Sequence, residues 1–345
     1  GRLILGILIN TPYPIKLIGD RSLSKRDFKR ISDPLSKFGA NFHLKNNINL
    51  PLKIKGSSNL KPIRYLEKKG SAQIKSSIIF AGMRTEGTTI IKCKKSRTHT
   101  EIICKYLKLP IKVNSKKNYD EISISKVKKI RSLNYNIPSD ISSGAFFMVL
   151  TALSENSELI IKNININPSR IGIIHILKKM GALIFIKNKK KYKGEMIGDI
   201  LVKSSKNLKA IKCPSKYNSS AIDEFLIIFL IAAKAKGISY FKDIGELNQK
   251  ESPRLKIGSK FLTMIGIKNY CTPSSIKIKG NPNLQLNGKY IMKDYLKDHR
   301  IFMMSTIAAL TLGGNWKIYD PQSANTSFPS FLKLIKKLGG KLIEI

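Results

Sequence analysis

Residues 250–254, with the sequence KESPR, combine acidic and basic side chains in a way that suits proton transfer beside an anion. Glu251 follows the ammonium group of Lys250, and the guanidinium of Arg254 comes three positions later. Side chains three positions apart on a helix lie on one face, so Glu251 and Arg254 are predicted to be neighbours. The alternative is an ordinary solvated helix start with a glutamate in its first turn.

Two further charged clusters stand where apolar segments begin. Asp223 and Glu224 interrupt the apolar run 221–233, and carboxylates buried there are costly unless they are paired or functional. Residues 298–300, DHR, precede the apolar run 301–310. His299 could donate a proton, and Arg300 could hold a phosphate or carboxylate with two hydrogen bonds. The alternative for Asp298 is a simple N-cap.

Hydroxyl and amide side chains mark two helix starts nearer the N-terminus. Residues 71–76, SAQIKS, place Ser71 and Gln73 before an apolar run, where a capped amphipathic helix is the alternative interpretation. Residues 96–101, SRTHTE, have the spacing of a capping box between Thr98 and Glu101. Such a cap does not exclude an anion at the same helix end.

The elements that must position these clusters repeat along the chain. Five times a polar cluster opens an apolar helix, a glycine turn leads to a β-branched strand, and a second polar cluster opens another helix. The third copy, around Ser142 and Arg170, is the plainest. Units of this kind are longer than common solenoid repeats and predict a multi-copy α/β architecture. Helix N-termini gathered at one place attract anions, so the substrate is predicted to be an anion.

The composition limits the class of protein. A length of 345 residues with 42% hydrophobic residues suits two domains with sizeable cores. The formal net charge is +41, from 63 basic and 22 acidic residues. The excess is mainly lysine spread along the chain, without an Arg-rich run or a basic motif interleaved with aromatic residues. We therefore expect solvated surface lysines rather than a nucleic-acid footprint.

The four cysteines form no CxxC pair and no short metal-ligand spacing with the four histidines. This favours a reduced, cytoplasmic protein without a metal. The apolar segment 3–9 is too short to span a bilayer, and no longer uncharged run follows it. The sequence thus predicts neither a membrane span nor a secretion signal.

Six segments, four of them described above, resemble in their order the 3-phosphoshikimate 1-carboxyvinyltransferase (EPSP synthase) family. They are residues 19–26 (GDRSLSKR), 71–76, 96–101, 250–254, 298–300 and 326–329 (TSFP). The resemblance implies an α/β fold of two domains made of repeated βαβαββ units, an inside-out α/β barrel, with five of six units present. With a boundary near Pro138, the expected domains are 1–137, which would lack its first unit, and 138–345.

The resemblance also implies an activity. Members of this family transfer the enolpyruvyl group of phosphoenolpyruvate to the 5-hydroxyl of shikimate 3-phosphate and release phosphate, on the route to chorismate and the aromatic amino acids. They need no cofactor and no metal. We expect both phosphorylated substrates as the partners, without nucleic acid or membrane, and a monomer.

Site residues are carried over position by position. The resemblance implies catalytic roles for Asp223, Glu251 and His299. It implies shikimate 3-phosphate binding by Ser71, Ala72, Gln73, Ser96, Asp223 and Lys250. It implies phosphoenolpyruvate binding by Arg26, Gln73, Arg254 and Arg300. Of the proton-transfer candidates on the methylene side, Glu251 is preferred to His299.

An N-terminal Gly-Ser-Lys-Ser segment of the family, with its substrate-binding lysine, is absent from the sequence. We therefore expect the chain to be incomplete and inactive alone. Two other readings stay open: an enolpyruvyl transferase that acts on UDP-N-acetylglucosamine, and a basic, non-catalytic nucleic-acid-binding protein.

Overall fold

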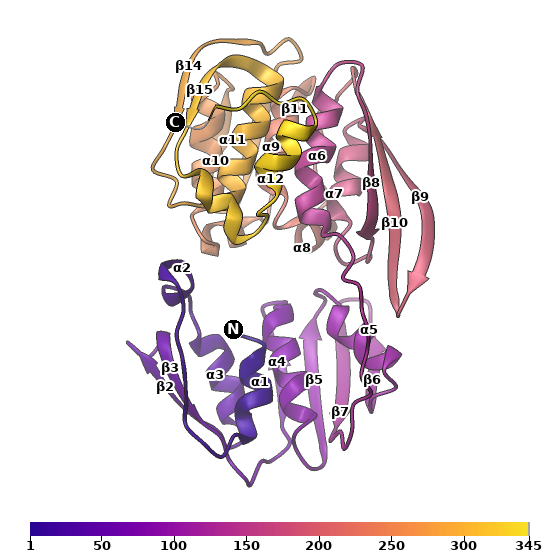
Figure 1. Cartoon of the computed structure of the whole chain (residues 1–345), viewed down its shortest axis with the longest axis vertical. Helices are drawn as coiled ribbons and strands as arrows, with labels where there is room; N and C mark the ends of the chain where they lie inside the picture. The colour runs from indigo at the N-terminus through magenta and orange to yellow at the C-terminus, as the bar shows by residue number, and fades with distance from the viewer. Residues whose placement is uncertain (344–345) are drawn as a thin grey trace. The chain divides into compact units, whose positions relative to one another are not determined.

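The computed structural model describes residues 1–343, with the side chains of all of them except positions 21 and 22. The chain forms two compact units (Figure 1). Unit 1 contains residues 1–136 together with 191–195, and unit 2 contains residues 137–190 and those from 196 onward. Each unit has a hydrophobic core of its own.

Unit 1 combines mixed sheets with helices. Its sheets have the strand orders β1-β3-β2 and β4-β5-β7-β6. The pair β4 and β5 is parallel, because α4 connects the two strands as a crossover, and the other pairs are antiparallel. The strands are β1 (Ile15–Leu17), β2 (Asn41–Lys45), β3 (Asn49–Lys55), β4 (Arg64–Glu67), β5 (Thr88–Lys94), β6 (Ile111–Ser115) and β7 (Tyr119–Ser125). The helices are α1 (Ile4–Ile7), η1 (Leu8–Asn10), α2 (Arg21–Ser24), α3 (Lys29–Ser36), α4 (Ala72–Gly82) and α5 (His99–Tyr106).

Unit 2 contains the sheets β8-β10-β9, β11-β13-β12 and the parallel pair β14-β15. Its strands are β8 (Glu158–Asn165), β9 (Leu183–Tyr192), β10 (Glu195–Lys203), β11 (Gly237–Phe241), β12 (Asn269–Cys271), β13 (Ile276–Gly280), β14 (Leu286–Met292) and β15 (Gly313–Ile318). Its helices are α6 (Ile141–Leu153), α7 (Gly172–Lys179), η2 (Ser215–Tyr217), α8 (Asn218–Ala221), α9 (Phe225–Ala233), η3 (Gly245–Gln249), α10 (Arg254–Met264), α11 (His299–Leu312), η4 (Pro321–Thr326) and α12 (Phe331–Lys337).

The sheets repeat one topology. The groups β1-β3-β2, β5-β7-β6, β8-β10-β9 and β11-β13-β12 all place the last strand between the first two. The pairs β4-β5 and β14-β15 are both parallel and enclose α4 and α11 respectively. The predicted repetition of helix and strand units is therefore confirmed. In the described part of the chain the sheets remain separate from one another.

Apolar helices make the centre of unit 2. Every residue of α9 is buried, and α6, α9 and α11 pack against one another (Figure 1). A helix that is apolar all round has no solvent face, so its polar neighbours are confined to its ends. Glu224 accordingly lies at the N-cap position of α9, outside its apolar body.

From the sequence, residues 21–26 are expected to precede a helix that runs to Phe38 and presents Arg26 at its start. Helix α3 lies within that range, and residues 21–24 form the separate helix α2. Asp20 accepts a hydrogen bond from the main-chain N–H of Leu23 at 2.6 Å, and Asp27 accepts one from that of Arg30 at 3.2 Å. Each aspartate thus accepts a hydrogen bond from a main-chain N–H in the first turn of the helix that follows it, and Arg26 lies between the two helices.

The glycine turns predicted to follow the apolar helices are confirmed at four helix ends. These residues have positive φ values, which glycine adopts without a steric penalty from a side chain: 113° at Gly39, 90° at Gly181, 78° at Gly266 and 91° at Gly339. Within residues 1–343, no helix combines the length and apolar character that crossing a membrane requires.

Candidate functional site

Three polar clusters of unit 2 lie at the starts of its packed helices. Glu224 occupies the N-cap position of α9. Asp298 is the N-cap of α11, and its carboxylate accepts a hydrogen bond from the main-chain N–H of Arg300 at 3.0 Å. Residues 250–253 connect η3 to α10, which begins at Arg254. Contacts between side chains join these three starts into one site.

Arg254 and Asp298 form the buried centre of this site. Their side chains are 2% and 0% exposed. Arg254 donates from Nε to Asp298 Oδ2 at 2.9 Å and from Nη2 to Oδ1 at 3.2 Å, and Ser252 Oγ adds a bond to Oδ2 at 2.8 Å. Burial works against both charges, yet each partner stabilises the other. The pKa of Asp298 is held below its usual value by Arg254, and the pKa of Arg254 is raised by Asp298, so both stay ionised.

Two more carboxylates surround the same guanidinium. Glu251 Oε2 lies 2.6 Å from Arg254 Nη2, and Asp223 Oδ1 lies 3.6 Å from Nη1. Asp223 Oδ1 is also 3.4 Å from Lys250 Nζ. Because α10 begins at Arg254, Glu251 lies in the segment that precedes this helix. The two side chains are neighbours as predicted, but they do not share a helix face. The structure thus brings Asp223, Lys250, Glu251 and Arg254 together.

His299 and Arg300 extend the site along the first turn of α11. Burial lowers the pKa of His299, so its imidazole is neutral at neutral pH. Arg300 Nη1 donates a hydrogen bond to the main-chain oxygen of Asp223 at 2.7 Å. The same nitrogen lies 3.7 Å from Glu224 Oε1. Arg300 therefore connects the starts of α9 and α11.

The third copy contributes residues whose role was not predicted. Ser142 Oγ, at the start of α6, donates a hydrogen bond to Glu224 Oε1. Arg170 Nη2 donates to Ser142 Oγ at 2.7 Å and to Asp140 Oδ1 at 2.8 Å. Burial raises the pKa of Glu224, although the nearby arginines oppose this. The available signal in the sequence was a carboxylate inside an apolar run, which requires a partner somewhere in the fold.

The start of α4 holds a second group of predicted residues, in unit 1. Ser71 Oγ accepts a hydrogen bond from the main chain of the first turn at 3.4 Å, and Ala72 is the first residue of the helix. Gln73 Oε1 accepts a hydrogen bond from Arg2 Nη1 at 2.7 Å. Arg2 Nη2 also donates to the main-chain oxygen of Asp27 at 2.7 Å. The amide of Gln73 is therefore oriented by Arg2.

Ser96 lies just before α5, and its buried hydroxyl oxygen has no hydrogen-bond partner among the residues that the structure describes. Behind this turn, Lys75 Nζ is fully buried, 2.5 Å from Glu101 Oε1 and 2.8 Å from the main-chain oxygen of Arg97. The capping box expected between Thr98 and Glu101 was wrong, because Thr98 makes no capping bond and Glu101 pairs with Lys75. The Lys75 ammonium is the stronger partner for a buried carboxylate.

Arg26 lies three positions before the first residue of α3. It lies between α2 and α3, where its main-chain oxygen accepts a hydrogen bond from Asn49 Nδ2 at 3.1 Å. The side chains of positions 21 and 22, part of the motif that includes Arg26, lie outside the described residues.

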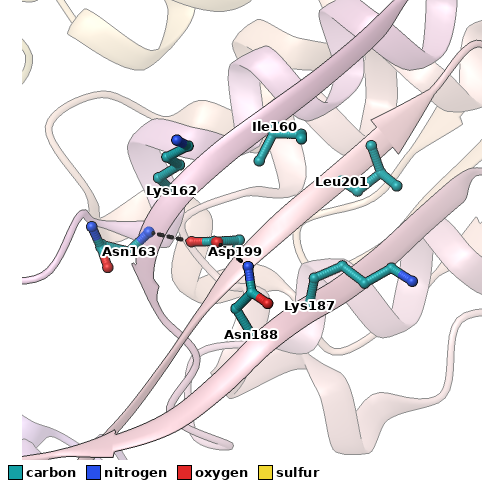
Figure 2. A pocket seen from close by; sticks show the side chains of 7 residues that line it. All are labelled: Ile160, Lys162, Asn163, Lys187, Asn188, Asp199 and Leu201. Atoms are coloured by element: carbon teal, nitrogen blue, oxygen red, sulfur yellow. Dashed lines mark hydrogen bonds between the residues drawn. The ribbon is translucent and has the colours of Figure 1, made fainter.

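A hollow of about 480 Å³ opens elsewhere in unit 2, on the sheet β8-β10-β9 (Figure 2). Asp199 sits there at a bulge of β10 and accepts hydrogen bonds from the main-chain N–H of Asn163 at 2.9 Å and from Asn188 Nδ2 at 2.7 Å. The bond from Asn188 lowers the pKa of Asp199. Both oxygens of this carboxylate accept hydrogen bonds from neighbouring strands of the same sheet. None of the predicted site residues lines the hollow.

The thiols and potential metal ligands are dispersed. Cys93, Cys104, Cys213 and Cys271 are free. Across the side chains that the structure describes, no three or more His, Cys, Asp or Glu residues form a group able to hold a metal ion. The acidic residues of the site face arginine and lysine instead.

Known proteins share both the sequence and the arrangement described above. Residues 1–335 match the family model described as EPSP synthase (3-phosphoshikimate 1-carboxyvinyltransferase). A relative from Ruthia magnifica subsp. Calyptogena magnifica, named 3-phosphoshikimate 1-carboxyvinyltransferase, is 39% identical over 343 residues, which are 98% of this chain and 76% of the relative. The chain belongs to the EPSP synthase family. A relative of the same name from Caldicellulosiruptor bescii is 39% identical over 336 residues, with 97% and 76% of the two chains covered.

Solved structures of the EPSP synthase family agree with this fold. An EPSP synthase from Acinetobacter baumannii superimposes with a TM-score of 0.84 at 36% identity, covering 97% of this chain and 76% of that one. The enolpyruvyl transferase NikO from Streptomyces tendae superimposes with a TM-score of 0.73 at 13% identity, over 97% of this chain and 75% of NikO. NikO shares the fold alone, whereas the EPSP synthases share the sequence as well.

Proposed function

We propose that this chain transfers the enolpyruvyl group of phosphoenolpyruvate to the 5-hydroxyl of shikimate 3-phosphate and releases phosphate, on the route to chorismate and the aromatic amino acids. Membership of the EPSP synthase family supports this reaction. One observation in unit 2 supports the assignment of the two proton-transfer roles. Asp223 and Glu251, two groups able to exchange protons, lie 3.6 Å and 2.6 Å from the same buried guanidinium of Arg254.

The addition of the 5-hydroxyl to the enol carbon needs two proton transfers, and the elimination of phosphate needs a further one. The 5-hydroxyl must lose its proton as its oxygen attacks the enol carbon, and the methylene carbon must gain one. When the phosphate leaves, the new methyl group gives up a proton and the double bond reforms. Asp223 is the proposed acceptor for the hydroxyl proton, with its negative charge balanced by Lys250 at 3.4 Å. Glu251 is the proposed group on the methylene side.

Glu251 suits the methylene side better than His299. Its carboxyl contacts Arg254 at 2.6 Å and is part exposed, so it can reach a ligand. A neutral His299 has no second proton to give at neutral pH, because burial lowers its pKa. We therefore assign His299 to the surroundings of the leaving phosphate, and Glu251 to proton transfer.

The arginines divide into two roles in this proposal. Arg300 is 11% exposed at the start of α11, where a phosphate or carboxylate of phosphoenolpyruvate could accept its hydrogen bonds. Arg26 and Gln73 keep their proposed role in binding phosphoenolpyruvate. Arg254 is more deeply buried and its guanidinium already faces Asp298, Glu251 and Asp223. For Arg254 to hold phosphoenolpyruvate, the ligand would take the place of Glu251 or Asp223. Before binding, its proposed role is to orient these two carboxylates.

Shikimate 3-phosphate is the proposed ligand of the helix starts at Ser71, Ala72, Gln73 and Ser96, and of Asp223 and Lys250. The strongest support is the hydroxyl of Ser96, because a buried oxygen without a partner is stabilised by a ligand that bonds to it. We further propose domains at 1–137 and 138–345 and a cytoplasmic monomer that needs neither metal nor cofactor. The division into compact units at residues 136 and 137 supports the boundary.

Calorimetry on the natural gene product that carries this chain tests the proposal. Shikimate 3-phosphate should bind, and UDP-N-acetylglucosamine should not. Replacement of Glu251 (E251Q) should preserve this binding while turnover falls by at least a hundredfold. Deuterium from heavy water should enter the methylene group with the unaltered protein and not with E251Q. Binding of the nucleotide sugar instead, or unchanged exchange in E251Q, would contradict the assignment.

A further inference from the structure

Glu224 is a buried carboxylate that the proposed mechanism does not use. It is 2% exposed and lies next to Asp223 at the N-cap position of α9. Its main-chain oxygen accepts the hydrogen bond of Ile228, so the residue is fixed to the first turn. A carboxylate held at this depth is unfavourable unless its contacts compensate for the lost hydration.

Side chains of two other helices contact the carboxylate of Glu224. Ser142 Oγ at the start of α6 donates to Oε1, and Arg300 Nη1 of α11 lies 3.7 Å from the same oxygen. Ser142 in turn accepts a hydrogen bond from Arg170, which precedes α7, at 2.7 Å. A continuous chain of polar contacts therefore runs from Arg170 through Ser142 and Glu224 to Arg300.

Arg300 ends this chain at the proposed proton acceptor. Its Nη1 donates to the main-chain oxygen of Asp223 at 2.7 Å, and this is the nitrogen that faces Glu224. One carboxylate thus restrains a guanidinium that touches the main chain beside a reacting group. Glu224 also precedes α9 directly, so a shift of Glu224 would move Asp223 with it.

We propose that Glu224 is a positioning residue, which holds Arg300 against the main chain of Asp223 so that this arginine presents its remaining donors to the anionic group of phosphoenolpyruvate. This inference rests on the proposed function. Its physical basis is that an arginine grips an anion well only when its planar group is oriented in advance. Ser142 and Arg170 hold the carboxylate from the other side. The proposal predicts that loss of the Glu224 charge weakens phosphoenolpyruvate more than shikimate 3-phosphate.

Steady-state kinetics of the isosteric variant E224Q, in the natural gene product, test this role. The amide keeps the shape of the side chain and can still accept the Ser142 hydrogen bond, but it removes the charge that faces Arg300. A displacement of about one ångström costs up to about a hundredfold, so we expect KM for phosphoenolpyruvate to rise about tenfold and KM for shikimate 3-phosphate to change less than twofold. The matched control is E158Q on β8, whose carboxylate is 52% exposed and pairs with Lys203. It should leave both constants unchanged.

A second variant keeps the inference testable if E224Q folds poorly. Replacement of Ser142 by alanine (S142A) leaves Glu224 and Arg300 in place and removes only the support behind them, so the same selective rise should appear with a smaller size. Equal changes for both substrates with a lower melting temperature would mean a structural role only and would overturn the proposal. Unchanged constants in E224Q would overturn it as well. Failure of the unaltered protein to bind either substrate would instead overturn the proposed function.

Discussion

The buried pair of Lys75 and Glu101 gives the sharpest prediction about stability. Lys75 Nζ has no exposure to solvent, and its contacts are Glu101 Oε1 at 2.5 Å and the main-chain oxygen of Arg97 at 2.8 Å. The other carboxylate oxygen of Glu101 is buried, and no described residue forms a hydrogen bond with it. Replacement of Lys75 by methionine (K75M) would keep an unbranched side chain of similar length and remove the charge. Glu101 would then be a buried carboxylate with no cation opposite it.

The size of the effect follows from burial. Removal of one member of a buried ion pair costs roughly 3–5 kcal/mol, because the remaining charge has lost its hydration and its partner. The double variant with leucine at position 101 (K75M/E101L) removes both charges, and replacing a buried pair by apolar side chains is often neutral or stabilising. We expect the double variant to recover most of the lost stability.

Urea unfolding followed by circular dichroism measures these differences. With a slope of about 2–3 kcal/mol per molar urea, K75M should lower the unfolding midpoint by roughly 1–2 M. The matched control is the methionine variant of Lys203 on β10, whose partner Glu158 lies at 2.7 Å while both side chains are about half exposed. Such a surface pair contributes about 0–1 kcal/mol, so this midpoint should hardly move.

Two results would refute the reasoning. The first is equal midpoints for K75M and the Lys203 variant, which would mean that burial does not decide the strength of these pairs. The second is a double variant no more stable than K75M, which would mean that the cost lies in lost packing or in the Arg97 contact and not in the unpaired carboxylate.

Three further outcomes follow from the charges and thiols. The pKa of Asp298 is held low by Arg254 against the effect of burial, so the unfolded chain binds more protons than the native one at acidic pH. This stabilisation is present above the ordinary aspartate pKa and is lost as pH falls through the native value, so replacing Asp298 by asparagine should flatten the acid limb of urea midpoints measured between about pH 3 and pH 7. Burial raises the pKa of the Cys93 thiol to about 12, whereas Cys271 is half-buried, so Ellman's reagent at about pH 8 should label Cys271 first in the native protein. Replacement of Lys250 by methionine should weaken binding of shikimate 3-phosphate by roughly ten- to a hundredfold in calorimetry, the ~1.5–3 kcal/mol of one hydrogen bond to a charged group.

Local patterns in the sequence were enough to find where the helices start. Apolar runs preceded by charged or hydroxyl residues predicted the positions of α4, α9 and α11, and glycines predicted where several helices end. These features depend on residues within a few positions of one another, because capping and left-handed backbone geometry are local. The repetition of the units was visible for the same reason.

The partners of the buried charged residues could not be predicted from the sequence, because they lie far away along the chain. Asp298 looked like a simple N-cap, yet its main partner Arg254 lies 44 positions away. Ser142 reaches Glu224 across 82 positions. Glu101 forms an ion pair with Lys75 of α4 instead of the capping box with Thr98. In each case a buried charge selected a partner of opposite charge or a strong donor, and only the packing of helices determines which one is in reach.

The strand order shared by the sheets has a consequence for how such an enzyme can change. Each copy supplies the same scaffold, while the reactive groups of unit 2 come from a few positions ahead of α9, α10 and α11. Gene duplication could therefore multiply equivalent anchoring points before any of them became specialised. The copy that begins with α6 is an example, since its Ser142 donates a hydrogen bond to Glu224 of the next copy and Arg170 donates one to Ser142. Selection for a different anionic metabolite would need to rewrite only these short stretches and could leave the sheets untouched.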